Sequence, residues 1–185
     1  MRFIKRLIKK TFEIMILYII PSIIIFLVLK YLLYSHLDYY SVYYAKHIKH
    51  SHDKDPEVQM VMKNLEYIEK PKTKFLVYDY VKGENLVKKI NYSGNKFDLD
   101  MYVMYSFGNI DLFDEKRYIY EFNENYEFFS IYKDEEGYSY SLSSEMEQEM
   151  KQKIRDIVQP IIDVQPKPKI NIQWIFNWFY EGDFN

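Results

Sequence analysis

The strongest pattern along the chain is a long apolar run near its beginning, from Phe12 to Tyr34. A helix needs about 20 consecutive apolar residues to cross the hydrocarbon core of a membrane, and the segment from Ile14 to Leu33 provides that length. Ser22 and Lys30 are its only polar residues apart from tyrosines. The pattern therefore predicts a transmembrane helix over residues 12–34.

Basic residues decide the expected orientation of this helix. Three lysines follow the run within about twenty residues, whereas five basic residues precede it: Arg2, Lys5, Arg6, Lys9 and Lys10. Positive charge favours the cytoplasmic side, so residues 1–11 are expected in the cytoplasm and the bulk of the chain outside it. A cleaved signal peptide is the alternative, but the run is too long for one and no small-x-small cleavage site follows. We expect an uncleaved single-pass anchor in the cell membrane.

Helical spacing continues beyond the apolar run. Leu37, Tyr40, Tyr44 and Ile48 recur every three or four residues, which predicts a juxtamembrane helix within residues 35–50. A polar linker then completes a segment that covers residues 35–56. The following residues 57–70 again have helical periodicity, and Pro71 is expected to end that helix.

The middle of the chain alternates between more and less polar positions and has turn residues at close intervals. The clearest case is a strand that begins at Phe97, in which Met101, Val103 and Tyr105 are expected on a buried face. The predicted strands cover residues 75–81, 86–92, 97–105, 117–122, 126–132 and 138–142, whereas the acidic stretch 111–115 is expected to be irregular. Short turns favour antiparallel neighbours, so we expect a meander of five or six strands.

A helix is expected after the strands. Ser144-Glu-Met-Glu147 has the form of a capping box, and an apolar stripe then extends from Met146 to Ile161. Pro160 and the Pro166-Lys-Pro168 segment are expected to break this helix. Such an amphipathic helix would pack across one face of the sheet.

The tail from residue 170 to residue 179 is rich in large apolar side chains. Trp174 and Trp178 are four residues apart, which fits a short helix. Its expected role is to close the core, and the alternative is an aromatic patch that binds a partner. Together these patterns predict an α+β fold: a transmembrane helix, then an extracytoplasmic antiparallel meander packed with one or two helices, over residues 57–185.

Charge is distributed unevenly along the chain. Residues 1–34 hold six Lys/Arg and one Glu, a net of +5, whereas residues 98–149 hold fourteen acidic residues and three basic ones, a net of −11. A nucleic-acid partner is disfavoured, because binding phosphates requires positive charge. The acidic block favours a protein partner with a basic surface, or a cation, and the alternative is that it only keeps the domain soluble.

Residue composition excludes some chemistry from the predicted domain. The chain has no cysteine, and its four histidines all lie between His36 and His52, so no Ser-His or Cys-His nucleophilic site can form in residues 57–185. The histidines are close enough in sequence for a zinc site, but a solvated linker is the better interpretation. No glycine-rich phosphate loop is present. We expect a non-catalytic protein without metal or cofactor.

Acidic side chains in and near the predicted sheet are the candidates for binding a partner. Asp98 and Asp100 are two apart in one strand and should share a face. Calcium binding or carboxylate catalysis would be an alternative use of these residues, but neither has its specific spacing. The complete set of partner-binding candidates is Asp98, Asp100, Asp111, Asp114, Glu115, Glu121 and Glu127.

The order of these elements resembles that of the TipC-type immunity proteins of Gram-positive bacteria. Three stretches carry the likeness: Leu37 to Tyr44 after the anchor, Tyr118 to Tyr132 before the helix, and Pro166 to Trp178 in the tail. The resemblance implies a protein anchored at the outer face of the cytoplasmic membrane that binds and neutralises an exported toxin of a type VII secretion system, without catalysis. Two other functions remain open: a bitopic accessory subunit of a cell-envelope, secretion or sensory complex, and an envelope enzyme that uses a carboxylate.

Overall fold

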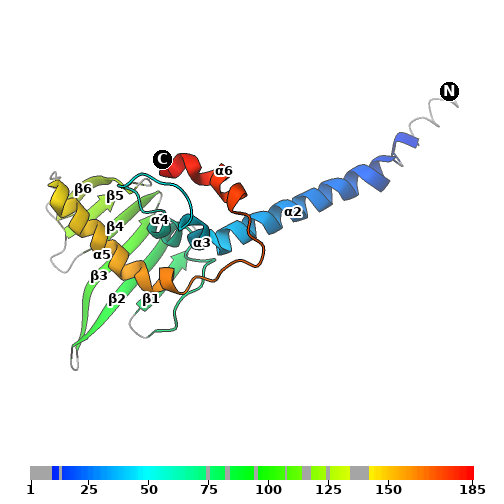
Figure 1. The fold of residues 1–185 in the computed structure, drawn as a ribbon. Helices are drawn as coiled ribbons and strands as arrows, with labels where there is room; N and C mark the ends of the chain where they lie inside the picture. Colours follow the sequence, from blue (N-terminus) through cyan, green and yellow to red (C-terminus); the bar gives the residue numbers. More distant parts are fainter. Residues whose placement is uncertain are drawn as a thin grey trace. The chain divides into compact units, whose positions relative to one another are not determined.

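The computed structural model describes residues 10–12, 14–73, 76–81, 84–93, 96–106, 108–113, 118–123, 126–133 and 142–185 (Figure 1). For residues 81, 89–93, 96–100 and 133 it describes the backbone alone. The chain divides into two compact units, Met1–Leu37 and Asp38–Asn185.

An apolar helical run begins at Lys10 in the first unit and ends at Tyr39, two residues beyond that unit. The run contains a π-helix, η1 (Met15–Ile19), and the α-helix α2 (Ile20–Tyr39). Most of its apolar side chains are exposed, whereas Leu37 near its end is buried, and the hydroxyl of Ser22 donates to the carbonyl oxygen of Tyr18 at 2.6 Å. Among the described residues, this is the one helix long and apolar enough to span a membrane, which is consistent with single-pass anchoring.

The second unit is built on one antiparallel sheet of six strands, with neighbours in chain order from β1 to β6. The strands are β1 (Leu76–Val81), β2 (Glu84–Ser93), β3 (Lys96–Ser106), β4 (Asn109–Phe113), β5 (Tyr118–Phe122) and β6 (Phe128–Lys133). The α+β class and the antiparallel meander are thus confirmed.

One strand was not predicted. The stretch expected to be irregular, 111–115, overlaps β4, in which Ile110 and Leu112 are buried and Leu112 pairs with Val103 of β3. Ile110 and Leu112 alternate with polar residues as in a strand, but the strand has only five residues and the acidic residues around it made this pattern hard to recognise. Most of the expected last strand at 138–142 lies outside the described residues.

Four helices accompany the sheet: α3 (Ser41–Ala45), α4 (Pro56–Lys63), α5 (Ser144–Asp163) and α6 (Gln173–Phe184). Helices α4 and α5 both contact β2 and β3, and α5 lies across the strands in Figure 1. Between the helices and the sheet lies the core, in which Val87, Val103, Leu112, Ile154 and Ile157 are fully or almost fully buried. Burying these apolar side chains is the main source of stability for the unit.

The helix at residues 57–70 is shorter than expected. It begins at Pro56, where the carboxylate of Asp55 accepts from the Val58 amide at 3.1 Å, and it ends at Lys63. The buried side chain of Asn85, on β2, donates to the carbonyl oxygen of Met62 at 2.6 Å. The sheet therefore satisfies a carbonyl group at the end of α4 that would otherwise be buried without a partner.

Two details of the predicted capped helix were also wrong. The cap is Ser143 rather than Ser144, because the Ser143 hydroxyl accepts from the amide of Met146. Pro160 does not break the helix, since α5 continues to Asp163 with Ile157 and Ile161 packed in the core on either side of the proline. Tertiary packing outweighs the lost backbone hydrogen bond.

Candidate functional site

The face of the sheet opposite α4 and α5 carries the candidate site. Strand register places alternate residues on this face, and most of them are half-buried or exposed, unlike their neighbours on the core face. We call it the open face and define it by these described residues: Val77, Asp79, Glu84, Leu86, Lys88, Tyr102, Met104, Ser106, Asn109, Asp111, Phe113, Ile119, Glu121, Ser130 and Tyr132.

Two carboxylates meet at the centre of the open face. Asp111 of β4 is directly opposite Glu121 of β5 in the antiparallel register. Glu121 in turn is opposite Ser130 of β6, whose hydroxyl donates to it. On its other side, Asp111 pairs with Met104 of β3. Two like charges directly opposite each other oppose strand pairing, so this arrangement costs stability.

Asp111 is almost fully buried although it lies on the open face. Its side chain is 7% exposed, and one carboxylate oxygen, Oδ1, has no hydrogen-bond partner. Burial, together with the negative charge of Glu121, raises the pKa of Asp111 from 3.8 to about 6. At neutral pH the carboxyl is therefore mostly ionised, desolvated and incompletely satisfied, which is a favourable setting for an added cation.

Aromatic and aliphatic side chains flank the two carboxylates. The rings of Tyr102 and Phe113 are stacked, with centroids 4.1 Å apart and an interplanar angle of 10°. The ammonium group of Lys88 lies 6.0 Å from the centroid of the Tyr102 ring. An acidic centre beside apolar rings can accept an arginine, whose guanidinium forms paired hydrogen bonds with carboxylates and stacks on aromatic faces.

The structure brings together two of the seven predicted site residues, Asp111 and Glu121. Glu127 is elsewhere, in the turn before β6, where its carboxylate accepts from the side-chain amide of Asn123 at 2.9 Å. The backbone of Asp98 and Asp100 lies in β3, but their side chains are outside the described part. Two further candidates, Asp114 and Glu115, fall outside the described residues.

Sequence reasoning missed the residues that surround the acidic pair. Ser130 was part of a predicted strand, but no local pattern links it to a carboxylate nine residues earlier. Phe113 was assigned to an irregular stretch, so its stacking on Tyr102 was not foreseen. The alternation of Ile110 and Leu112 was the signal that could have placed Phe113 and Asp111 on one face.

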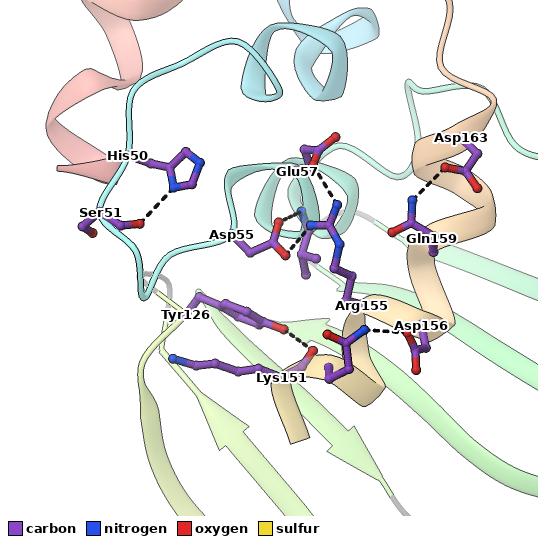
Figure 2. A network of polar contacts seen from close by, with 12 residues as sticks. His50, Ser51, Asp55, Glu57, Tyr126, Lys151, Arg155, Asp156, Gln159 and Asp163 are labelled. Carbon is purple, nitrogen blue, oxygen red and sulfur yellow. Dashed lines mark hydrogen bonds and ion pairs between the residues drawn. The ribbon is translucent and has the colours of Figure 1, made fainter. Parts of the chain in front are cut away.

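A second polar cluster lies on the core side of the sheet, and Figure 2 shows it around Arg155. The guanidinium of this α5 residue bridges Asp55 and Glu57 at the start of α4, with Nη2 at 2.8 Å from the Glu57 carboxylate. Burial lowers the pKa of Arg155, but hydrogen bonds to Asp55 and Glu57 outweigh this and raise the pKa above its ordinary value. Both terminal nitrogens of the guanidinium thus bind a carboxylate, and the cluster fastens α5 to α4.

A depression of about 480 Å³ lies beside this cluster, and Asp55, Tyr126 and Lys151 contribute to its lining. The Tyr126 hydroxyl donates to the carbonyl oxygen of Lys151 at 2.9 Å, so it too is committed within the fold. Within the part of the chain that the structure describes, no three histidine or carboxylate side chains gather to hold a metal ion. The open face is therefore the better candidate site.

Comparisons of the chain with protein-family models, with curated proteins and with solved structures found no match.

Proposed function

We propose that this chain is a non-catalytic, single-pass membrane-anchored binding protein whose open face takes a basic side chain from a protein partner. One observation carries the proposal: Asp111 Oδ1 is buried without a partner and lies beside a second carboxylate, Glu121. Such a pair costs stability in the free protein, and a cation placed between the two groups would remove that cost.

The chemistry of the surroundings favours a protein partner over a free ion. Binding hot spots combine a charged anchor with large apolar side chains that exclude water. The open face provides both, because the acidic pair lies among Met104, Phe113 and Ile119. A partner that places an arginine there would bury the apolar rim at the same time.

The anchor and the charge distribution support a location outside the cytoplasm. The five basic residues before the apolar run favour a cytoplasmic beginning of the chain, which leaves the residues after the run on the extracytoplasmic side. The net charge of −11 over residues 98–149 favours a basic partner there. With the resemblance in element order, the most specific form of this proposal is an immunity protein that neutralises an exported toxin.

A pull-down with the full-length chain, guided by the gene next to its own, would identify the partner. Calorimetry would then compare Asp111→Asn and Glu121→Gln with the unchanged chain. Truncating one side of a buried charge pair commonly costs 2–5 kcal/mol of binding free energy, so we expect affinity to fall by at least about 30-fold for either variant.

Glu127→Gln is the matched control, since it removes the same charge from a carboxylate that lies outside the acidic pair. Its affinity should stay within about threefold of the unchanged chain, because exposed charges contribute little. Equal affinities for Asp111→Asn, Glu121→Gln and the unchanged chain would refute binding at the open face.

The second candidate function is an accessory subunit of an envelope complex, favoured by the long apolar helix itself. In such a subunit the helix would contact other membrane proteins, whereas an immunity protein needs it only as a tether. Replacing residues 12–34 with an unrelated transmembrane span separates the two functions. Toxin protection should survive the replacement if the tether suffices, and function should be lost if the helix makes specific contacts.

A further inference from the structure

Helix α6 exposes an apolar face that the proposed partner site does not use. Trp174 and Trp178 are one helical turn apart and are 72% and 76% exposed. Phe179 and Ile170 add further exposed apolar area on and just before the helix. The opposite face of α6 is buried through Phe176. Two adjacent, largely exposed tryptophans on a well-packed helix indicate a surface that something else covers.

Helix α6 is fastened to the segment that follows the anchor. The hydroxyl of Tyr44, in α3, donates to the carbonyl oxygen of Ile170 and accepts from the amide of Ile172, both at 3.2 Å. Gln173 donates to the carbonyl oxygen of Tyr44 at 2.9 Å, and the rings of Tyr44 and Phe176 have centroids 5.4 Å apart. These contacts fix α6 to α3 within the compact unit.

Chain length limits how far α6 can be from a membrane that contains the anchor. The apolar run ends at Tyr34, ten residues before Tyr44. Even a fully extended chain would span only about 35 Å over ten residues. Any membrane crossed by residues 12–34 is therefore within reach of the helix that Tyr44 holds.

The exposed residues have the chemistry of a membrane interface. Tryptophan side chains concentrate at the level of the lipid headgroups, because the indole is apolar and its N–H needs a polar partner. Exposed lysines lie in the two segments joined by Tyr44: Lys46 and Lys49 after α3, and Lys167 and Lys169 before α6. These cations complement anionic headgroups.

We infer that α6 inserts its tryptophan face, formed by Trp174 and Trp178, into the headgroup region of the membrane that the anchor spans. The inference rests on the proposed anchoring and is independent of what the open face binds. Insertion would hold the compact unit against the bilayer at a second point besides its tether.

The chain allows a direct test, because its only two tryptophans are these residues. The full-length protein would be reconstituted into vesicles of phosphatidylcholine and phosphatidylglycerol, with or without lipids brominated near the headgroup. Tryptophan emission, excited selectively over tyrosine, should be shifted to shorter wavelength, and the brominated lipids should quench most of it. Lipids brominated deep in the acyl chains should quench it less.

A control variant places a tryptophan on another exposed aromatic position. Phe129 on β6 is 67% exposed, so Phe129→Trp in a chain with Trp174→Phe and Trp178→Phe provides a similarly exposed reporter outside α6. Its emission should remain that of a tryptophan in water, without quenching. Equal quenching of this reporter would mean that the unit adsorbs nonspecifically, which would overturn the inference.

Flotation of the vesicles tests the anchor separately. A chain that does not float with the vesicles would refute the anchoring and, with it, this inference. A chain that floats but keeps unquenched emission would refute the inference alone. Emission at short wavelength without quenching would mean that a protein, such as a second copy of the chain, covers the tryptophan face. That result would also overturn the inference.

Discussion

Replacing Asp111 with asparagine should make the folded protein more stable at neutral and alkaline pH. The carboxyl group has a pKa of about 6 in the fold and an ordinary value of 3.8. Between these values the folded chain holds a proton that the unfolded chain has released, so the free energy of unfolding falls as the pH rises from about 4 to 6. Asparagine cannot ionise, so the variant should not lose this stability.

The size of the effect follows from the same two values. At 1.36 kcal/mol per pKa unit, the interval between 3.8 and about 6 corresponds to about 3 kcal/mol. Residual contact with water reduces this limit, and we expect the variant to gain about 2 kcal/mol at pH 8. At pH 3 and below, Asp111 is mostly protonated in both states of the unchanged chain, and the two proteins should differ by less than about 0.5 kcal/mol.

Urea unfolding of the full-length protein in detergent micelles, followed by circular dichroism at pH 3, 6 and 8, measures this difference. Glu127→Gln is again the control, because Glu127 is exposed in a turn and its replacement should change stability little at any pH. An Asp111→Asn variant that is no more stable than the unchanged chain at pH 8 would show that the ionised Asp111 carboxyl does not destabilise the fold. The Asp111 carboxylate would then not destabilise the folded state, and the proposal that it is an unsatisfied group available to a partner would be wrong.

Three further substitutions, one of them with a control variant, test how the helices are held. Asn85→Ala should cost about 1–3 kcal/mol in urea unfolding, because it leaves the Met62 carbonyl buried without a donor; an unchanged midpoint would contradict this. Arg155→Met should cost about 1–3 kcal/mol, since it leaves two partly buried carboxylates without their cationic partner. Lys153→Met, which removes a more exposed pair on the same helix, should cost less than about 0.5 kcal/mol, and equal losses in thermal melts would refute the distinction. Pro160→Ala should raise stability by about 1–3 kcal/mol, because a proline inside a helix removes a hydrogen bond; a lower melting temperature would show that the ring is needed.

The parts of the fold that depend on local patterns could be predicted from the sequence. The alternation at Met101, Val103 and Tyr105 separated a core face from an open face, and close turns indicated antiparallel pairing. Local patterns gave the wrong residue where two neighbouring residues fitted the same pattern. Ser143 and Ser144 are adjacent possible caps, and only the hydrogen bond from Met146 distinguishes them.

The candidate site depends on contacts that local patterns do not encode. Asp111 meets Glu121 because of the register between β4 and β5, and a slip of one residue would have placed Asp111 opposite Tyr120 or Phe122 instead. Arg155 meets Asp55 across 100 positions of sequence. Neither pairing could be read from the sequence, although the acidic composition of the region did indicate where a binding site should be sought.

The bonds between Tyr44 and α6 also constrain the order in which the protein folds. Their partners are 126 to 129 positions apart, so the segment around α3 cannot complete its packing until residues 170–173 have been made. At a synthesis rate of about 5–20 residues per second, that delay is on the order of ten seconds. During this interval the aromatic surface of Tyr44 has no Phe176 to cover it. Assistance from chaperones would matter most in this interval, before the last helix closes the unit.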